Sequence, residues 1–219
     1  MLHLLCPVPR KVYVAVSGGV DSMAVLNFLA RSHDVTALYF DHGDSYARGE
    51  LDFVKTYCDK IHVQLIDGAL MRSKRADESI EEYWRDERYR FFEWVHNNKL
   101  ETDVVTAHHL GDAVETWIWS SLNGQSTLPH IRRGHIIRPF LSTPKADLYD
   151  WALRHNVPWM EDPTNLDTSK TRNFIRSQMD MFEKINPGLS TMVKKKVIQM
   201  AEKRSEPVDS IPSDVTLVT

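Results

Sequence analysis

The sequence predicts an α/β fold, a doubly wound parallel sheet with helices on both faces. Short β-branched runs alternate with longer segments whose apolar residues recur at helical spacing. The first such run, Lys11–Val16, passes through Ser17-Gly18-Gly19 directly into a helical segment. The chain has 219 residues, 42% of them hydrophobic, which is enough to bury a substantial core. Together these observations favour repeated strand–helix–strand units over an all-α or all-β fold.

Each element follows from its own residue pattern. Strands are predicted where Val, Ile, Tyr or Phe dominate a short run: Lys11–Val16, Val35–Phe40, Ile61–Ile66, Asp103–Thr106 and His135–Arg138. Helices are predicted where apolar residues repeat every three or four positions: Asp21–Arg31, Tyr46–Lys60, Ser79–Asn98, Asp112–Leu122, Pro144–His155, Arg172–Phe182 and Leu189–Lys203. A turn at Asn186-Pro187-Gly188 separates the last two helices.

The C-terminal part of the chain differs in composition. We expect one α/β domain over residues 1–182, a basic helical appendage over 183–204 and a mobile tail over 205–219, where periodicity is weak. Between Lys170 and Arg204 there are nine Lys and Arg but three acids, although the whole chain carries a net charge of −3. This asymmetry is expected if one end of the chain contacts a polyanion. A solvated helical surface would show the same asymmetry.

Several classes of protein are disfavoured. No apolar run approaches the roughly 18 residues of a membrane helix, and the start of the chain is too short and lacks the basic residues of a signal peptide. We therefore expect a cytoplasmic protein that does not span a membrane. Cys6 and Cys58 are far apart and form no Cys-x-x-Cys motif, so they are interpreted as plain thiols without a zinc or iron–sulfur site.

The strongest chemical signal is the turn after the first strand, Ser17-Gly18-Gly19-Val20-Asp21-Ser22. A strand that runs through glycines into a helix makes an anion site, because backbone N–H groups and the helix dipole both face the ligand. Ser17 and Ser22 can add hydroxyl donors, and Asp21 can hold Mg²⁺, which prefers carboxylate and phosphate oxygen. The chain contains neither G-x-x-x-x-G-K-[ST] nor G-x-G-x-x-G, so a P-loop or dinucleotide fold lacks its motif.

This turn resembles the signature loop of the N-type ATP pyrophosphatases, the PP-loop enzymes with an adenine nucleotide α hydrolase-like fold. The resemblance implies that Ser17, Gly18, Gly19, Val20, Asp21 and Ser22 bind the phosphates of ATP while a substrate oxygen attacks the α-phosphate. Asp21 is then the metal ligand, and ATP and Mg²⁺ are the implied cofactors.

Further segments, in the family's order, are similar to the tRNA(Ile)-lysidine synthetase family. They are Asp41-His42-Gly43, the helix with Glu81, Arg85, Arg88 and Tyr89, the run Ala107–Thr116, Arg138-Pro139-Phe140-Leu141, Glu161–Asn165 and Arg172–Arg176. Each is weak alone, but the ordered set is specific. It implies that the wobble cytidine of a tRNA is adenylated at its C2 oxygen and then attacked by free lysine. The implied partners are therefore the tRNA anticodon loop and lysine.

Asp112 and Glu115 are three residues apart on a predicted helix, so their carboxylates share a face. The resemblance implies that they receive the lysine, and a solvated acidic face is the alternative. His109 ends a strand at the carboxyl edge of the sheet, where ligands bind in open α/β folds, and we expect His108 or His109 to touch the phosphate or the activated oxygen. The resemblance further implies that Asp41 and His42 lie near the adenosine.

Four arginines are candidate substrate ligands. Arg85 and Arg88 share a helix face with Glu81, which permits either a substrate contact or an internal Glu81–Arg85 ion pair. Arg172 and Arg176 are also one turn apart, and such like charges suggest an anion partner. We expect Arg172 to act in catalysis, and both to bind the tRNA or the charge of the transition state.

The chain departs from the family at three places, one of which is Ala113 and the segment Ser121–Thr127, where the family's Gln and its basic, glycine-rich segment are usual. Gly111 stands where the family's first Asp of an Asp-Asp pair is usual, so one carboxylate is lost. The sequence also ends soon after the predicted catalytic domain, which leaves the means of tRNA grip, the oligomeric state and any accessory protein open. The alternatives are another PP-loop tRNA-modifying enzyme, such as a thiolase, and a nucleotide- or RNA-binding module without turnover.

Overall fold

Six strands form one sheet in the computed structural model, which describes residues 2–43, 47–161 and 171–205. Their order is β3-β2-β1-β4-β6-β5. The bounds are β1 Lys11–Val16, β2 Asp34–Asp41, β3 Gln64–Ala69, β4 Val104–Val105, β5 Arg132–Arg133 and β6 Ile136–Ile137. All neighbouring pairs are parallel except β5 and β6, which form an antiparallel edge. The predicted doubly wound α/β class is confirmed.

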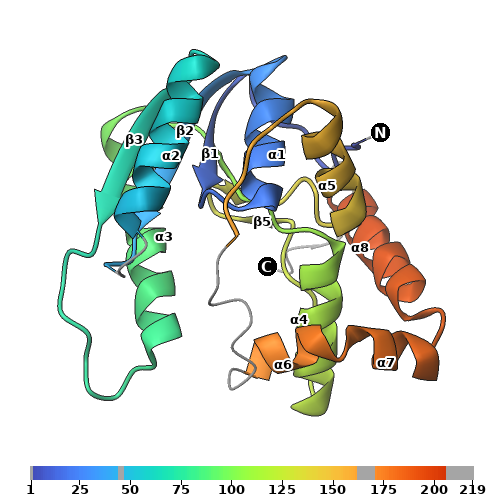
Figure 1. The fold of residues 1–219 in the computed structure, drawn as a ribbon. Coiled ribbons are helices and arrows are strands. Elements are labelled where there is room, and N and C mark those ends of the chain that lie inside the picture. The colour runs from blue at the N-terminus through green and yellow to red at the C-terminus, as the bar shows by residue number, and fades with distance from the viewer. Residues whose placement is uncertain (1, 44–46, 162–170, 206–219) are drawn as a thin grey trace, which may run out of the picture.

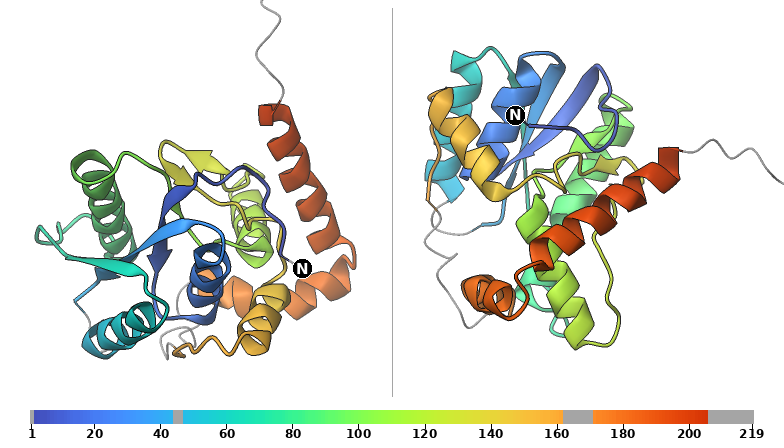
Figure 2. Two further views of the ribbon diagram at one scale, coloured as in Figure 1. Left: turned by 90° about the horizontal axis from the view of Figure 1, so that it is seen from above. Right: turned by 90° about the vertical axis from the view of Figure 1, so that its right-hand side faces the viewer.

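The helices cover both faces of this sheet (Figures 1 and 2). Their bounds are α1 Val20–Ala30, α2 Ala47–Lys60, α3 Ile80–Asn98, α4 Leu110–Leu122, α5 Lys145–Arg154, α6 Thr171–Ser177, α7 Met179–Ile185 and α8 Leu189–Ser205. In the left panel of Figure 2, which views the molecule from above, α1, α2 and α5 lie on one side of the sheet and α3 lies on the other. Among the described helices, none has the length and apolar character needed to cross a bilayer.

Strand β1 divides its side chains between two cores. Val12, Val14 and Val16 are buried in the cluster that also contains the inner residues of α1, α2 and α5. Tyr13, one position out of phase, belongs to the cluster on the opposite face, where Phe91 and Phe92 of α3 are buried. This division follows from the two-residue period of a strand, and burial on both faces explains why β1 reads as a nearly continuous apolar run.

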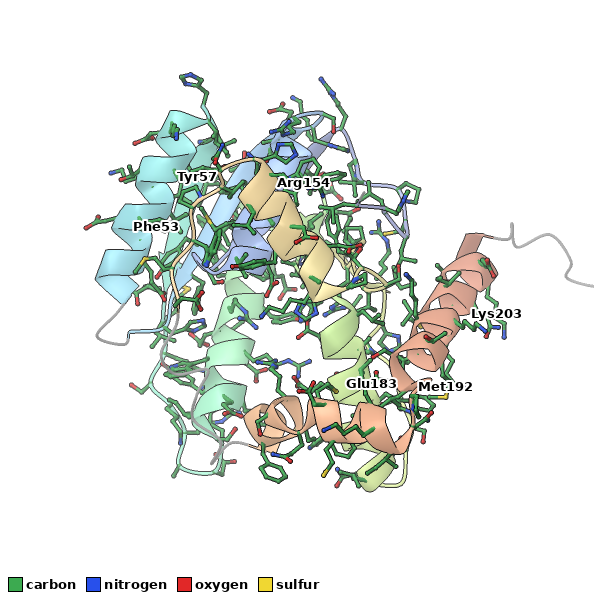
Figure 3. The ribbon with its side chains drawn as sticks, turned by 45° about the vertical axis from the view of Figure 1, so that its right-hand side comes forward. Phe53, Tyr57, Arg154, Glu183, Met192 and Lys203 are labelled. Atoms are coloured by element: carbon green, nitrogen blue, oxygen red, sulfur yellow. The ribbon has the colours of Figure 1, made fainter. Side chains whose placement is uncertain are left out.

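A further apolar cluster lies beside the sheet and joins the C-terminal helices to α4. It contains Val114 and Ile118 of α4, Ile175 of α6, and Val193 and Val197 of α8. At the corner between α7 and α8, the Glu183 carboxylate accepts a hydrogen bond from the backbone N–H of Ser190 at 3.0 Å, and Figure 3 shows Glu183 next to the first turns of α8. The last helices are therefore packed against the α/β core through α4.

Three local expectations are corrected. The predicted strand Ile61–Ile66 lies three residues further along, because a turn after α2 places His62 at a φ of +57° before β3 begins. The predicted helix Arg172–Phe182 is two helices, α6 and α7, which meet at Gln178. Ile175 faces α4, whereas the chain beyond Gln178 turns to meet α8, so one straight helix cannot serve both contacts. Strand β5 was not predicted.

The loop between β3 and α3 is anchored by a buried carboxylate. Glu87 is 2% exposed and accepts hydrogen bonds from the backbone N–H groups of Met71 at 2.9 Å and Arg72 at 3.2 Å. Its other oxygen lies 3.1 Å from Arg72 Nε and 3.2 Å from a guanidinium nitrogen of Arg90. Arg72 also holds Glu78 through two hydrogen bonds, and these lower the pKa of Glu78 to about 2.

We expect Glu87→Ala to lower the free energy of unfolding by about 3 kcal/mol, because the change leaves two backbone donors without their buried acceptor and removes one of the two carboxylates that pair with Arg72. Urea denaturation measures this loss. Glu82→Ala, at an exposed position in the first turn of the same helix, is the matched control and should cost less than about 1 kcal/mol. Equal, small effects of the two substitutions would contradict the assignment of Glu87 as the anchor.

Candidate functional site

The turn between β1 and α1 is held in shape by its two serines. Ser22 Oγ accepts a hydrogen bond from the backbone N–H of Ser17 at 3.1 Å and donates to the carbonyl of Gly19 at 3.0 Å. Ser17 Oγ lies 3.2 Å from the same hydroxyl. Gly18 has a φ of +80°, a conformation that glycine adopts without the strain of a Cβ. The predicted phosphate-binding residues therefore form one preorganised loop.

The N-terminus of α1 opens toward this loop. Gly19 occupies the N-cap and supplies no side-chain cap, so the first N–H groups of the helix have no side-chain acceptor. Such uncapped groups, with the positive end of the helix dipole, form an anion site. The backbone N–H of Met160 donates to the carbonyl of Gly18 at 2.9 Å, which ties the segment after α5 to the loop.

Asp21 is the point at which α1, α4 and α5 meet. Its Oδ2 lies 3.6 Å from His109 Nε2 and 3.5 Å from Lys145 Nζ. Its Oδ1 is buried and has no hydrogen-bond partner among the described residues. A buried carboxylate oxygen beside an anion site has the chemistry of a Mg²⁺ ligand. Lys145 was missed by sequence reasoning, although its place at the start of the helix that follows β6 puts it at the carboxyl edge of the sheet.

His109 links Asp21 to Asp112. It is the N-cap of α4. Its ring Nδ1 accepts a hydrogen bond from the backbone N–H of Gly111 at 3.0 Å, and its backbone N–H donates one to Asp112 Oδ2 at 2.9 Å. With Nδ1 as an acceptor, the ring proton resides on Nε2 and faces Asp21. Burial disfavours the charged ring, but Asp21 and Asp112 outweigh it and raise the pKa of His109.

Gly111 permits this arrangement. A Cβ at position 111 would lie 2.7 Å from His109 Cε1 and 3.0 Å from Nδ1, closer than carbon atoms approach without displacement. The histidine cap and a side chain at 111 therefore exclude each other in this geometry. In this chain Gly111 leaves room for the histidine ring to pack onto the helix N-terminus.

His108 is the second histidine of this edge and is neutral. Its Nδ1 lies 2.8 Å from Thr106 Oγ1. Burial, together with the charges of Arg138 and Arg88, lowers the pKa of His108 to about 4 against the opposing effect of Asp112. The ring thus separates the acidic side of the site from its arginines without carrying a charge at neutral pH.

The His108 shift predicts a pH dependence of stability. Between about pH 6.5, where the ring titrates in the unfolded chain, and about pH 4, the unfolded state binds more protons than the folded state. The free energy of unfolding should therefore fall by up to about 2 kcal/mol from pH 7 to pH 5 through this group. His109 contributes in the opposite sense, because its raised pKa stabilises the fold at low pH and that contribution is lost as pH rises.

Urea unfolding of His108→Asn at pH 7 and pH 5 checks this prediction, since asparagine keeps a partner for Thr106 but does not titrate. The variant should lose less stability on acidification than the original chain. His3→Asn, at an exposed histidine, should behave like the original chain. An unchanged pH dependence in His108→Asn would contradict the account.

Asp112 and Glu115 lie on one face of α4, as their spacing predicts, and both contact Arg176. Glu115 is 1% exposed, and its Oε2 accepts from Arg176 Nε at 3.0 Å and lies 2.7 Å from the terminal nitrogen Nη2. The same nitrogen is 3.6 Å from Asp112 Oδ1. Burial raises the pKa of Asp112, but His109 and His108 prevail and hold it below its usual range. The burial of Glu115 excludes a solvated acidic face.

Two other predicted groups flank this centre. Asp41 ends β2, the neighbour of β1, and its Oδ1 accepts from the backbone N–H of Gly43 at 2.6 Å. The His42 ring lies 5.1 Å from that of Phe40 and 5.4 Å from that of Trp84. Both residues are at the same sheet edge as the loop. Arg172 is in the first turn of α6, but its side chain lies outside the described residues, as do most residues of the Glu161–Asn165 motif.

Helix α3 carries Arg85 and Arg88, which lie near a third arginine, Arg138. Arg85 lies 5.7 Å from the centre of the Tyr89 ring, and Arg138 donates to the Tyr89 hydroxyl at 2.9 Å. Burial, together with the charges of Arg85 and Arg138, lowers the pKa of Arg88 despite the opposing effect of Tyr89. Among the described residues, no carboxylate lies within ion-pair distance of Arg85, Arg88 or Arg138. The internal Glu81–Arg85 pair is therefore not formed.

The sequence is similar to that of a known protein family. A family model described as a PP-loop domain matches residues 3–181. A protein named tRNA(Ile)-lysidine synthase from Nitrosomonas europaea is 32% identical over 196 residues, which cover 81% of this chain and 42% of that protein. The protein of the same name from Thermosipho africanus is 33% identical over 191 residues, or 81% of this chain and 45% of that protein. The chain thus spans less than half the length of these relatives.

Solved structures with low sequence identity share the fold. The U34-tRNA thiolase NcsA from Methanococcus maripaludis superposes with a TM-score of 0.72 at 15% identity, over 90% of this chain and 74% of that one. The NMN synthetase from Francisella tularensis gives a TM-score of 0.53 at 11% identity, over 97% and 90% of the two chains. At these identities the likeness extends to the fold alone.

Proposed function

The chain belongs to the PP-loop domain family, and on that premise we propose that it uses ATP to activate a tRNA base and then joins lysine to it. The base is the wobble cytidine of tRNA(Ile), and the products are lysidine, AMP and pyrophosphate. One observation carries the proposal. His109 contacts both Asp112 and Asp21, so the Asp112–Glu115 pair lies next to Asp21 and the phosphate loop. This pair of carboxylates is able to hold an alkylammonium. The lysidine synthase relatives support the choice of base and amine.

ATP is bound at the carboxyl edge of β1. The uncapped N–H groups of α1, the hydroxyls of Ser17 and Ser22, and Lys145 supply the donors and the positive charge that its phosphates require. Asp21 Oδ1 is the atom suited to hold Mg²⁺, which would neutralise charge on the phosphate oxygens. Asp41 and His42, at the end of the neighbouring strand, are assigned to the adenosine.

The reaction has two steps. The C2 oxygen of the cytosine bonds to the α-phosphorus of ATP as the bond to pyrophosphate breaks. The ε-nitrogen of lysine then bonds to C2, and the bond from C2 to oxygen breaks and releases AMP. Asp112 and Glu115 hold the lysine ammonium, with Arg176 as the group that neutralises them before it arrives. The carboxylates of Asp112 and Glu115 are assigned to draw off the proton that the nitrogen loses, while the Nε2–H of His109 faces Asp21 beside the phosphates.

The arginines take the developing and resident negative charges. Arg88 is assigned to the phosphates or the tRNA backbone, and Arg85 to the tRNA backbone, where an arginine without a carboxylate partner is most effective. Arg172 is assigned, with Arg176, to the tRNA or the transition state, on the strength of the motif. The anticodon loop suits this site because its bases can be unstacked at low cost.

Sulfur transfer, the alternative reaction, is less well supported. A thiolase that used a cysteine nucleophile would need a thiolate, and burial raises the pKa of Cys58 to about 11. Burial also raises the pKa of Cys6, with Asp103 adding to it against Arg132. Cys6 and Cys58 are both free thiols. Because burial keeps both cysteines in the thiol form, they give no support to sulfur transfer, and an amine is the better-supported nucleophile.

Release of pyrophosphate tests the proposal. Purified protein is incubated with ATP, Mg²⁺, lysine and tRNA(Ile) bearing a CAU anticodon, and each component is omitted in turn. Release that requires ATP, Mg²⁺ and tRNA, with AMP formation that also requires lysine, is the expected result. No release in any combination would favour the binding module without turnover, and turnover that ignores lysine would point to another nucleophile.

A further inference from the structure

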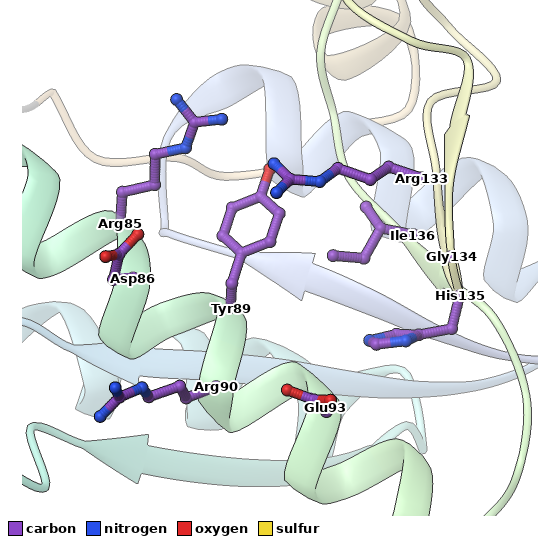
Figure 4. Close-up of a pocket in the computed structure, with 9 residues that line it drawn as sticks. All are labelled: Arg85, Asp86, Tyr89, Arg90, Glu93, Arg133, Gly134, His135 and Ile136. Atoms are coloured by element: carbon purple, nitrogen blue, oxygen red, sulfur yellow. The ribbon is translucent and has the colours of Figure 1, made fainter.

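A groove lies between α3 and the hairpin formed by β5 and β6, on the flank of the candidate site (Figure 4). Its volume is about 430 Å³, and its walls include Arg85, Tyr89 and Arg133. In Figure 4 the side chains of Arg85 and Arg133 approach the Tyr89 ring from the helix and from the hairpin. This groove is separate from the phosphate loop, since its lining residues come only from α3 and from residues 133–136.

Tyr89 fixes the spacing of three guanidinium groups. Arg85 and Arg133 lie 5.7 and 5.8 Å from the centre of its ring, and Arg138 donates to its hydroxyl at 2.9 Å. Cation–π contacts and the hydrogen bond restrict these long side chains, so less conformational entropy is lost when they bind an anion. Tyr89 is thus a positioning residue.

Three arginines line the groove, and one of them, Arg90, pairs with Glu87 at 3.2 Å. Neither Arg85 nor Arg133 has a carboxylate within ion-pair distance among the described residues, although Asp86 and Glu93 also line the groove. By contrast, Arg132, the neighbour of Arg133 on the hairpin, makes a two-bonded ion pair with Asp103 at 2.6 and 2.7 Å. Among the described residues of the groove, the guanidinium groups without an ion-pair partner are therefore those of Arg85 and Arg133.

The groove is continuous with the site through Arg138. This arginine follows β6 at the carboxyl edge, touches Tyr89 on one side, and together with Arg88 contributes to the lowered pKa of His108 on the other. A row of guanidinium groups thus runs from the hairpin to the histidines beside Asp112. Arg138 is itself buried, so the positive charge that a polyanion can reach at this flank lies on the exposed Arg85 and Arg133.

We propose that this groove binds the phosphodiester backbone of the RNA strand that delivers the target base. The inference rests on the proposed function for the identity of the strand and extends it to a contact surface that includes Arg133, on an element outside every sequence motif. Guanidinium groups bind phosphate oxygens through paired N–H donors, and such contacts position an RNA without reading its sequence. ATP has its own anion site at the loop, so the groove remains available for the backbone.

The test is the affinity of the 219-residue chain for CAU-anticodon tRNA(Ile) across a range of salt concentrations, with the double variant Arg85→Gln/Arg133→Gln. Each lost phosphate contact removes about 0.7 from the slope of log affinity against log salt for a single strand. We expect the slope to become shallower by about 1.5 and the affinity to fall at least about tenfold at low salt. The affinity for ATP should stay unchanged, because neither arginine is part of the phosphate loop.

Two further variants make the result specific. Arg85→Lys/Arg133→Lys keeps the charge and should restore most of the salt slope. Arg154→Gln removes an exposed arginine on α5 (Figure 3), a helix that contributes no residue to the groove, and should bind tRNA like the original chain. A double variant with unchanged affinity and slope, or an original chain that binds no tRNA, would overturn the groove assignment.

Binding and chemistry fail separately in this design. A chain that binds tRNA through the groove but forms no lysine product keeps the groove and refutes the proposed function. A chain that forms lysidine while the double variant binds normally keeps the function and refutes the groove. An equal loss in the control Arg154→Gln would also count against the groove, because the effect would then be one of net charge.

Discussion

Asp21→Asn should reduce pyrophosphate release from ATP by roughly a thousandfold. The substitution keeps the size of the side chain but removes the charge that faces His109 and Lys145 and weakens the proposed metal ligand at Oδ1. Loss of one preorganised electrostatic contact at a reacting phosphate costs about 3 to 4 kcal/mol of transition-state stabilisation, which corresponds to two to three powers of ten in rate. Steady-state release with saturating ATP measures it.

The matched control for this change is Asp34→Asn, at an exposed position at the start of β2 on the opposite edge of the sheet. That variant should release pyrophosphate at the original rate. Raising Mg²⁺ should recover part of the Asp21→Asn activity if the defect lies in metal affinity. Activity of Asp21→Asn within threefold of the original chain would contradict the assignment of Asp21 to the phosphate site.

Glu115→Gln should separate the two steps of the reaction. Glutamine can still accept a hydrogen bond from Arg176, so the fold and the adenylation step should survive, with pyrophosphate release within about threefold of the original. Lysine transfer should fall by about a hundredfold or more, because the ammonium loses one of its two carboxylates and Arg176 keeps an unbalanced charge near it. Parallel assays of pyrophosphate and of labelled lysine in tRNA measure the ratio.

Glu202→Gln, at an exposed position on α8, is the control for this prediction and should leave both rates unchanged. Thermal unfolding of Glu115→Gln should be checked as well, since Glu115 is buried. An equal fall in both steps, with a stable protein, would place Glu115 in the phosphate site rather than the lysine site. Unchanged lysine transfer would remove it from the active centre.

Local patterns were sufficient for much of this fold. The Ser17–Ser22 loop was predictable because glycines, hydroxyls and an acid are consecutive where a strand becomes a helix. The shared face of Asp112 and Glu115 was predictable because it depends only on helical spacing. The parallel direction of the main strands was predictable from the alternation of strand-like and helical segments. The burial of these strands on both sheet faces leaves a strong apolar signal in the sequence.

Features that depend on distant residues were not predictable. The Lys145–Asp21 contact joins two helices that start at the same sheet edge, which becomes evident only when β6 and β1 are placed in one sheet. The break at Gln178 arises because successive turns meet different helices, although the apolar spacing continues through it. The short antiparallel strand of Arg132 and Arg133 has a charged sequence with no strand pattern, and the hairpin alone defines it.

Gly111 has a structural consequence that the sequence alone does not reveal. The sequence shows only that a carboxylate is absent at this position. In the structure the absence of a Cβ allows the His109 ring to cap α4 and to reach Asp21. The physical consequence of the glycine is therefore the space that the His109 ring occupies at the start of α4, which no spacing argument contains.

Mass analysis of the wobble nucleoside is the most direct test of the central claim. CAU-anticodon tRNA(Ile) is incubated with the protein, ATP, Mg²⁺ and lysine, digested to nucleosides, and compared with a reaction that lacks lysine. The account predicts a nucleoside with the mass of cytidine plus lysine less one water, formed only in the complete reaction and absent with Glu115→Gln on the same time scale. Unmodified cytidine, or a nucleoside that has gained sulfur instead of lysine, would contradict it.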